Sequence, residues 1–215
     1  MRIFILANGK ASRWNNYMGV DKQLIVIDGE PILNRTVRLL KENGQDDIWI
    51  IGKYKVEGAK NNIPNIESVI GKYDVTRELW DNIDSFVLLY GDCYYTDAII
   101  KDICTRKTDK KWLHWCCQRP NKFTGKPWEE GYAHRIYDVN WWREQCNSFH
   151  EREKKEVINY TNDWVFLRHI LGLNLTIHQP HLMKDNEVDW EDETDDFDFP
   201  VDYDNWMRNV KGIKK

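Results

Sequence analysis

Residues 1–14, MRIFILANGKASRW, join a short apolar run to a polar turn at the start of the chain. The β-branched and aromatic residues of RIFILA, residues 2–7, predict a buried strand. Small residues at positions 7, 9, 11 and 12 would let backbone N–H groups come close to a phosphate, and Arg13 adds a fork of donors. The same letters also suit an ordinary polar turn. The stretch therefore leaves two interpretations open, an anion-binding loop or a plain connection.

Length and composition favour a single α/β domain that spans residues 1–215. The chain has 215 residues, 41% of them hydrophobic, which is enough for one sizeable core. No apolar run approaches the roughly 20 residues that a membrane-spanning helix needs. The apolar start is short and leads straight into polar residues, unlike a secretory signal. We therefore expect a soluble, cytoplasmic protein without a membrane partner.

Cysteine usage fits the same compartment. None of the five cysteines forms a C-x-x-C pair, and two of them are adjacent in the sequence. An odd number without framework spacing is typical of reduced thiols in the cytosol. These spacings do not predict a zinc site.

The charge is distributed unevenly along the chain. The formal net charge is -4, yet residues 185–204 carry 11 acidic residues and no Lys or Arg. The remainder is therefore net positive, which suits either a polyphosphate ligand or a solvated basic face. Because no dense basic stripe is present, we do not expect a nucleic-acid partner.

Hydrophobic periodicity predicts alternating strands and helices. Strands are expected at residues 2–7, 23–28, 47–52, 85–92, 111–117, 131–139 and 174–178. Helices are expected at 31–43, 75–80, 96–106 with Thr96 as N-cap, and 162–173, with a loop over 53–72. This order predicts a three-layer α/β sandwich with a mostly parallel sheet and helices on both faces.

One carboxylate follows the apolar strand of LLYGDCYY, residues 88–95. Asp92 comes after Gly91, which permits a tight turn, and would emerge at the edge of the sheet. A carboxylate at the end of a buried strand is costly unless it is paired or holds a metal. The alternative is a simple strand-ending turn or a helix cap.

A second acidic feature is TDDFDFPVDYDNW, residues 194–206. A solvated acidic tail is one interpretation. Against it, aromatic residues alternate with the acids and Pro200 interrupts the run. We therefore expect a docked segment that delivers one carboxylate inward, Asp198 or a neighbour.

These stretches together resemble the nucleotidyltransferase family with a GT-A-like fold, which includes sugar-phosphate nucleotidyltransferases and MobA-like enzymes. The matching pieces, in the family's order, are LANGKASRW (6–14), DKQLIVIDGEPIL (21–33), LLYGD (88–92) and FDFPVDYDNW (197–206). The chain departs from the family pattern at Ala11, where Gly is frequent, at Asp21, where Pro is common, and at Val201, where Glu is usual. The expected base-reading loop at residues 60–80 has no clear match.

The resemblance implies transfer of a nucleoside monophosphate from an NTP to a phosphorylated small molecule, with release of pyrophosphate. Arg13 and Lys22 would be catalytic, and Asp92 and Asp198 would hold Mg²⁺. The implied nucleotide-binding residues are Leu6, Ala7, Asn8, Gly9, Lys10, Ala11, Ser12 and Asp92. CTP or another pyrimidine nucleotide is the favoured donor, and a homodimer is compatible with the sequence.

Acceptor contacts are expected in PWEEGYAHRIYD, residues 127–138. The candidates are Glu130, His134 and Arg135, although His134 is more typical of a structural strand histidine than of a catalytic one. His178 and His181 in HQPH form a conceivable metal pair, but two histidines around a proline are usually incidental.

Two other functions remain open from the sequence. A GT-A glycosyltransferase would share the sheet and an acidic metal motif, but gives no reason for the Arg13 loop followed by Lys22. A non-catalytic nucleotide-binding module would bind the ligand without turnover.

Overall fold

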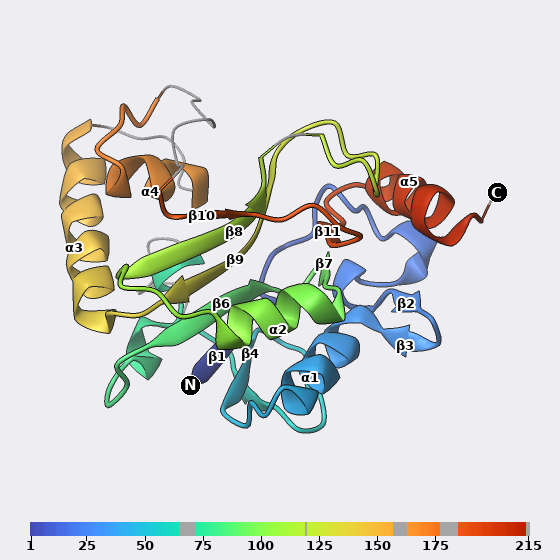
Figure 1. Cartoon of the computed structure of the whole chain (residues 1–215), viewed down its shortest axis with the longest axis horizontal. Helices are drawn as coiled ribbons and strands as arrows, with labels where there is room; N and C mark the ends of the chain where they lie inside the picture. Colours follow the sequence, from blue (N-terminus) through green and yellow to red (C-terminus); the bar gives the residue numbers. More distant parts are fainter. Residues whose placement is uncertain (65–71, 119, 157–162, 177–184, 214–215) are drawn as a thin grey trace.

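The computed structural model describes residues 1–64, 72–118, 120–156, 163–176 and 185–213, and its centre is a seven-stranded mixed sheet (Figure 1). The strand order is β10-β8-β9-β6-β1-β4-β5. The strands are β1 (Arg2–Leu6), β4 (Ile48–Ile51), β5 (Lys60–Asn62), β6 (Phe86–Tyr90), β8 (Trp112–Cys117), β9 (Glu130–Ile136) and β10 (Glu187–Asp189). Within this sheet β9 alone runs against its neighbours, so the expected mostly parallel mixed sheet is confirmed.

Helices cover both faces of the sheet (Figure 1). Alternation along β1 sends Ile3 and Ile5 to one face and Phe4 and Leu6 to the other, because successive strand side chains point to opposite sides. The first face packs against α1 (Ile32–Glu42) and α2 (Asp97–Thr105). The second packs against α3 (Val139–Glu156) and α4 (Asp163–Ile170). The expected three-layer α/β sandwich is therefore confirmed.

The acidic segment near the C-terminus is docked, as its aromatic residues predict. β11 (Asp195–Asp196) pairs antiparallel with β7 (Cys93–Tyr94), and α5 (Pro200–Lys211) follows it. Phe197 and Trp206 are fully buried in a cluster that also holds Trp14. Pro200 begins the helix, where its missing N–H costs nothing. The solvated-tail interpretation is wrong.

Two regions around the first helices differ from the expected elements. In QLIVID the predicted strand is mostly wrong: residues 22–24 form a 3₁₀ turn, and β2 (Val26–Ile27) pairs only with β3 (Glu30–Pro31). Asp28 and Gly29 join these two strands with positive φ angles of 55° and 83°, as a tight hairpin turn requires. The region predicted to be a loop, 53–72, contains β5 at the sheet edge.

The region after β9 also departs from expectation. The sequence analysis did not predict α3, because its charged residues hide an apolar stripe of Trp142, Cys146 and Phe149, all fully or nearly fully buried. No strand forms at residues 174–176, and the rest of that predicted strand lies outside the described residues. The last strand of the main sheet is instead β10.

The polar helix cap and the cysteines follow the sequence closely. Thr96 caps α2, and its hydroxyl accepts a hydrogen bond from the Ile99 N–H at 3.4 Å. All five cysteines are buried, and none of them forms a disulfide. None of the described helices is long and apolar enough to span a bilayer.

Candidate active site

The polar loop after β1 starts in a narrow space between two glycines. Gly52 follows β4 and Gly91 follows β6, the two strands that flank β1. A Cβ at Gly52 would lie 2.5 Å from the Ala7 carbonyl oxygen, and one at Gly91 would lie 2.9 Å from the Ala7 Cβ. Both positions therefore need glycine for close approach. Beyond this point the loop opens to solvent, with Gly9, Lys10, Ser12 and Arg13 exposed.

The far end of the loop is anchored by Trp14. Its indole is 1% exposed and donates from Nε1 to the Val20 carbonyl oxygen at 2.9 Å. Its ring lies edge-on to Tyr17 and to Tyr203 of α5. Tyr17 also donates from its hydroxyl to Asp204 Oδ1 at 2.7 Å. The loop is thus held between the sheet and the C-terminal helix.

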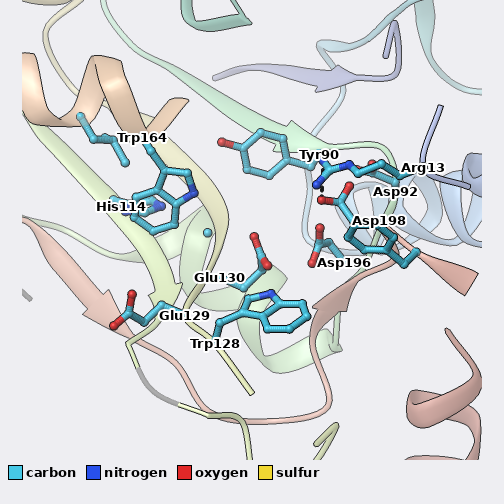
Figure 2. Close-up of a pocket in the computed structure, with 13 residues that line it drawn as sticks. Arg13, Tyr90, Asp92, His114, Trp128, Glu129, Glu130, Trp164, Asp196 and Asp198 are labelled. Carbon is cyan, nitrogen blue, oxygen red and sulfur yellow. Dashed lines mark ion pairs between the residues drawn. The ribbon is translucent and has the colours of Figure 1, made fainter. Parts of the chain in front are cut away.

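Four charged side chains form a continuous ionic chain beside this loop. The Arg13 guanidinium lies 2.6 Å from Asp198 Oδ2, and Lys22 Nζ lies 3.0 Å from Asp198 Oδ1. Lys22 also pairs with Asp92 at the end of β6. Figure 2 shows Arg13, Asp92 and Asp198 gathered on one side of a cavity. Residues from the start, middle and end of the chain thus meet at one point.

The protonation of this chain follows from its partners. Burial alone would lower the pKa of Lys22, which is 6% exposed, but Asp92 and Asp198 outweigh burial and raise that pKa. Burial would raise the pKa of Asp198, but Lys22 and Arg13 outweigh it and lower that pKa. At neutral pH Lys22 is therefore an ammonium and Asp198 a carboxylate.

Asp21, where the family commonly has Pro, is held in place by two partners. Its Oδ2 accepts a hydrogen bond from the Tyr54 hydroxyl at 2.8 Å and forms an ion pair with Lys53 Nζ at 2.7 Å. The hydrogen bonds from Lys53 and Tyr54 lower the pKa of Asp21. These contacts fix the backbone directly before Lys22, a task that the rigid ring of Pro would otherwise perform.

A second buried cation, Lys126, was missed by the sequence analysis. It is 5% exposed, and burial alone would lower its pKa, but the surrounding carboxylates outweigh burial and raise that pKa. Its Nζ contacts Glu130 at 3.2 Å, Asp195 at 3.3 Å, Asp202 at 4.0 Å, and Asp196. Lys126 thereby ties the turn before β9 to the C-terminal segment. The one signal in the sequence was a lysine before proline within a turn-rich stretch.

A cavity of about 420 Å³ opens next to the ionic chain (Figure 2). It runs over the ends of β6, β9 and β8 and reaches α4. Its lining residues are Arg13, Tyr90, Asp92, His114, Trp128, Glu129, Glu130, Gly131, Trp164, Leu167, Asp196, Asp198 and Phe199. The cavity therefore joins the expected phosphate-binding residues to an aromatic and acidic pocket.

Of the three acceptor candidates, only Glu130 lines this cavity. His134 is 4% exposed and stacks on His114 with ring centroids 4.5 Å apart. Its Nδ1 accepts from Trp112 Nε1 at 3.2 Å and its Nε2 lies 3.0 Å from the Tyr90 hydroxyl. Burial lowers the pKa of His134 to about 3, so the ring is neutral. His134 is thus held as a structural residue behind the cavity.

Arg135 lies on the opposite side of β9 from His134. Its guanidinium donates to the Ile103 carbonyl oxygen of α2 at 2.7 Å, and it stacks over Tyr137. This position follows from the alternation of strand side chains. Neither His134 nor Arg135 reaches the cavity, so the structure gives them no contact with an acceptor there.

The acidic residues around the cavity suit a divalent cation. Asp92 and Asp198 both contact the same Lys22 nitrogen, so their carboxylates already converge on one positive charge. Asp196 lines the same cavity. Carboxylate oxygens are the protein ligands that Mg²⁺ prefers, so the donor set fits this ion. The conceivable but usually incidental histidine pair at residues 178 and 181 lies outside the described residues.

A different set of metal-ligand residues lies at β8 and β10. Ligand atoms of His114, Cys116 and Glu187 all lie within 4.8 Å of one another. Within this group the Cys116 thiol donates a hydrogen bond to the Glu187 carboxyl. The spacing of the cysteines could not reveal this cluster, because Glu187 lies far from Cys116 in the sequence and comes next to it only when β10 pairs with β8.

The three-layer sandwich with its mixed, mostly parallel sheet has the GT-A-like fold of nucleotidyltransferases. The model of the MobA-like NTP transferase domain matches residues 3–113, about half of the chain. The protein therefore belongs to the MobA-like NTP transferase family. No curated protein sequence matches the chain.

Solved structures confirm the fold over nearly the whole chain. A CTP:phosphocholine cytidylyltransferase from Streptococcus pneumoniae is 14% identical, with 99% of each chain covered and a TM-score of 0.53. An inositol-1-phosphate CTP transferase from T. maritima is 13% identical, with 100% of this chain and 98% of that one covered and a TM-score of 0.56. HddC from Yersinia pseudotuberculosis, complexed with GMP-PN, is 14% identical, with 99% of each chain covered and a TM-score of 0.54.

Proposed function

We propose that this protein is a Mg²⁺-dependent nucleotidyltransferase that moves a nucleoside monophosphate from an NTP to a phosphorylated small molecule and releases pyrophosphate. The observation that carries the proposal is the ionic chain Arg13–Asp198–Lys22–Asp92 beside the exposed loop at residues 8–12. Membership of the MobA-like NTP transferase family supports the reaction class. We further propose that residues 1–215 act as one domain in the cytoplasm.

The loop supplies the triphosphate site. Backbone N–H groups of the loop would donate to phosphate oxygens, as the nucleotide-binding role of residues 6–12 implies. Arg13 and Lys22 now share Asp198, so each would exchange a carboxylate oxygen for a phosphate oxygen when the NTP binds. Their charges would then stabilise the α-phosphate and the departing pyrophosphate.

Asp92 and Asp198 are the residues that would hold Mg²⁺. Bound Mg²⁺ supplies charge neutralisation for the triphosphate. Asp198 is well suited to the task because Lys22 and Arg13 keep its pKa low and its carboxylate ionised.

The acceptor phosphate would act as the nucleophile. One of its oxygens would attack the α-phosphorus, forming a new P–O–P bond while the bond from the α-phosphorus to the bridging oxygen breaks. Pyrophosphate leaves with the electron pair of that bond. Because the acceptor phosphate is already ionised, no general base is required, and positioning supplies most of the rate. His134 lies behind the cavity and takes no part in this scheme, which agrees with a reaction that needs no general base.

CTP or another pyrimidine nucleotide is the donor that we propose. Two structural neighbours are named for their use of CTP. The acceptor would enter the cavity over β9 and β8, with Glu130 on its wall.

A pyrophosphate-release screen tests the proposal. Purified protein is assayed with Mg²⁺ and each of CTP, UTP, GTP and ATP against a panel of phosphorylated sugars and alcohols. Arg13→Ala and Asp92→Asn should each abolish release, whereas Arg38→Ala, on the exposed side of α1 between Glu30 and Glu42, should not. Release of a nucleoside diphosphate from a nucleotide-sugar would instead favour a glycosyltransferase. Nucleotide binding without turnover of any acceptor would favour a non-catalytic module.

A further inference from the structure

Two neighbouring strands at one edge of the main sheet bring together three side chains of the kinds that bind metals. His114 and Cys116 lie two positions apart on β8 and therefore point to the same face. In the parallel pairing of β10 with β8, Glu187 lies opposite His114. A ring nitrogen of His114, the Cys116 Sγ and a Glu187 carboxylate oxygen all lie within 4.8 Å of one another. This group shares no residue with the ionic chain at the end of β1.

The imidazole of His114 is held firmly by aromatic neighbours. Its ring is 1% exposed, stacks on His134 with centroids 4.5 Å apart, and meets Trp164 edge-on at 6.3 Å. Its Nδ1 is buried, and none of the residues that the structure describes gives it a hydrogen bond. Buried polar atoms nearly always have a partner, so such an exception needs an explanation. The ring is thus fixed in orientation while part of its bonding capacity is unused.

The protonation of the three groups suits a metal ligand set. Burial and the neighbouring His134 lower the pKa of His114 well below its usual value, so the ring is neutral, which is the form that binds metals. The Cys116 thiol donates a hydrogen bond to the Glu187 carboxyl. A bound cation would replace that thiol proton: the S–H bond breaks, a sulfur–metal bond forms, and the proton leaves to solvent.

The donor set distinguishes this group from an oxygen-only site. Imidazole nitrogen and thiolate sulfur favour Zn²⁺ and related transition metals, whereas Mg²⁺ prefers oxygen ligands. Tetrahedral Zn²⁺ with such ligands places their donor atoms about 3.5 Å apart, so no pair here needs to close by more than about 1.3 Å. Gln118 Nε2 donates to Glu187 Oε2, and hydrogen bonds of this kind orient a ligating carboxylate.

The position of the group gives a bound cation a structural task. β10 has three residues and is the edge strand of the described sheet, and the chain continues from it to β11 and Asp198. A cation held by both strands would clamp β10 to β8. His114 also lines the cavity, beside Trp164 and on the side away from Arg13 (Figure 2). Water from the cavity would thus reach the fourth position of a tetrahedral ion.

We propose that His114, Cys116 and Glu187 form a binding site for a divalent transition-metal cation of the Zn²⁺ class, with water as the fourth ligand. The cation ties β10 to β8 and so stabilises the path of the chain into the C-terminal segment. This site is separate from the Mg²⁺ site proposed at Asp92 and Asp198, and it does not depend on nucleotidyl transfer.

Cobalt spectroscopy tests the site directly, because Co²⁺ takes the same ligands as Zn²⁺ and is coloured. The full-length protein is freed of metal under reducing conditions and titrated with Co²⁺ in excess Mg²⁺, which occupies oxygen-only sites. We expect one equivalent of tetrahedral Co²⁺ with a thiolate-to-cobalt charge-transfer band, and Zn²⁺ should displace it because Zn²⁺ binds such sites more tightly. Absence of the thiolate band at about tenfold excess of Co²⁺ would overturn the proposal.

Variants of the ligands assign the band to this group. Cys116→Ala should remove the thiolate band, and both Cys116→Ala and Glu187→Gln should raise the Kd for Zn²⁺ more than about 100-fold, since loss of a second-shell partner alone costs 10–100-fold. Cys117→Ala is the matched control, because this equally buried neighbour faces the other side of β8 and should leave band and Kd unchanged. A band that survives in Cys116→Ala would overturn the proposal.

Thermal unfolding gives a second readout that needs no activity. A ligand that binds only the folded state raises Tm, so Zn²⁺ should raise the Tm of the wild-type protein and of Cys117→Ala. Glu187→Gln keeps the shape of the side chain and remains able to pair with Gln118, so it should fold, but its Tm should not respond to Zn²⁺. An equal rise in Tm for Glu187→Gln and the wild-type protein would place the stabilising cation elsewhere and overturn the site.

Discussion

Lys22 Nζ lies 3.0 Å from Asp198 Oδ1, across 176 positions of the sequence. The match to the family model ends at residue 113. This contact therefore joins the half of the chain that matches the model to a segment outside the match. Phe197, which precedes Asp198, and Trp206 of α5 are fully buried and hold the segment in place. The proposed phosphate-binding site is therefore complete only when the C-terminal segment is docked.

Removing the shared cation should affect catalysis more than folding. In Lys22→Ala, Asp92 and Asp198 lose a common partner, but both carboxylates remain partly exposed and can be hydrated. We expect kcat for pyrophosphate release to fall at least about 100-fold, as for the loss of a group that stabilises transition-state charge. Thermal unfolding should change much less. Lys41→Ala, which breaks an exposed pair with Asp46 on α1, is the matched control.

An unchanged rate in Lys22→Ala would remove this lysine from the catalytic machinery. A large drop in thermal stability together with the lost rate would instead indicate a structural role. Circular dichroism on the same samples separates these outcomes.

Metal dependence should follow Asp92 and Asp198. We expect chelation to abolish pyrophosphate release and added Mg²⁺ to restore it. Asp198→Asn should raise the Mg²⁺ concentration needed for half-maximal rate at least about tenfold, because an amide keeps one oxygen but loses the charge that holds a hard cation. Asp97→Asn, at the exposed start of α2, should not alter the requirement. Full activity in chelator would contradict the assignment.

The four residues of the ionic chain could be named from the sequence, and local patterns pointed to two of them, Asp92 and Asp198. Asp92 follows the continuous apolar strand β6, and Asp198 lies among aromatic residues that a solvated tail would not need. Resemblance to the family's motifs then linked these residues to Arg13 and Lys22. Hydrophobic periodicity also predicted five strands of the main sheet, namely β1, β4, β6, β8 and β9. It predicted α1, α2, α4 and a helical turn near residue 77 as well.

The missed features depend on contacts between distant segments. Lys126 is a cation in a polar turn when seen in sequence, and only the fold surrounds it with carboxylates from β11 and α5. His134 and Arg135 are neighbours in sequence, yet alternation on β9 sends one toward His114 and the other toward α2. The sequence could suggest acceptor-binding candidates on β9, but it could not show on which side of the sheet each of their side chains lies.

The glycine after β4 should prove sensitive to a single methyl group. Gly52→Ala would place a Cβ 2.5 Å from the Ala7 carbonyl oxygen, a backbone atom that cannot rotate away, and its φ of 147° adds strain. We expect a loss of about 1–3 kcal/mol in the free energy of unfolding. The displaced loop should also raise KM for the NTP. Urea unfolding and steady-state kinetics measure the two effects.

Gly9 provides the matched control within the loop itself. A Cβ there meets nothing within 4 Å, and its φ lies outside the left-handed range. Gly9→Ala should therefore change the free energy of unfolding by less than about 0.5 kcal/mol. Equal costs at the two glycines would show that close approach to Ala7 is not what Gly52 provides.

Lys126→Met should destabilise the protein in a pH-dependent way. The change leaves Glu130, Asp195 and Asp196 without their buried cation, and removal of one partner from a buried ionic group costs about 3–5 kcal/mol. Burial already raises the folded-state pKa of all three carboxyls above the unfolded value, with Lys126 acting in the opposite direction. Without Lys126 these pKa values should rise further.

A raised folded-state pKa means that folding favours the neutral carboxyl. The stabilising effect is fully present below the unfolded-state pKa and is lost as pH rises through the folded-state pKa. The stability gap between Lys126→Met and the wild-type protein should therefore be smaller at pH 5.5 than at pH 8, as measured by urea unfolding. Lys122→Met, an exposed residue in the same turn, should cost less than about 0.5 kcal/mol at either pH. A gap that does not change with pH would mean that the carboxyls around Lys126 do not take up protons when it is lost.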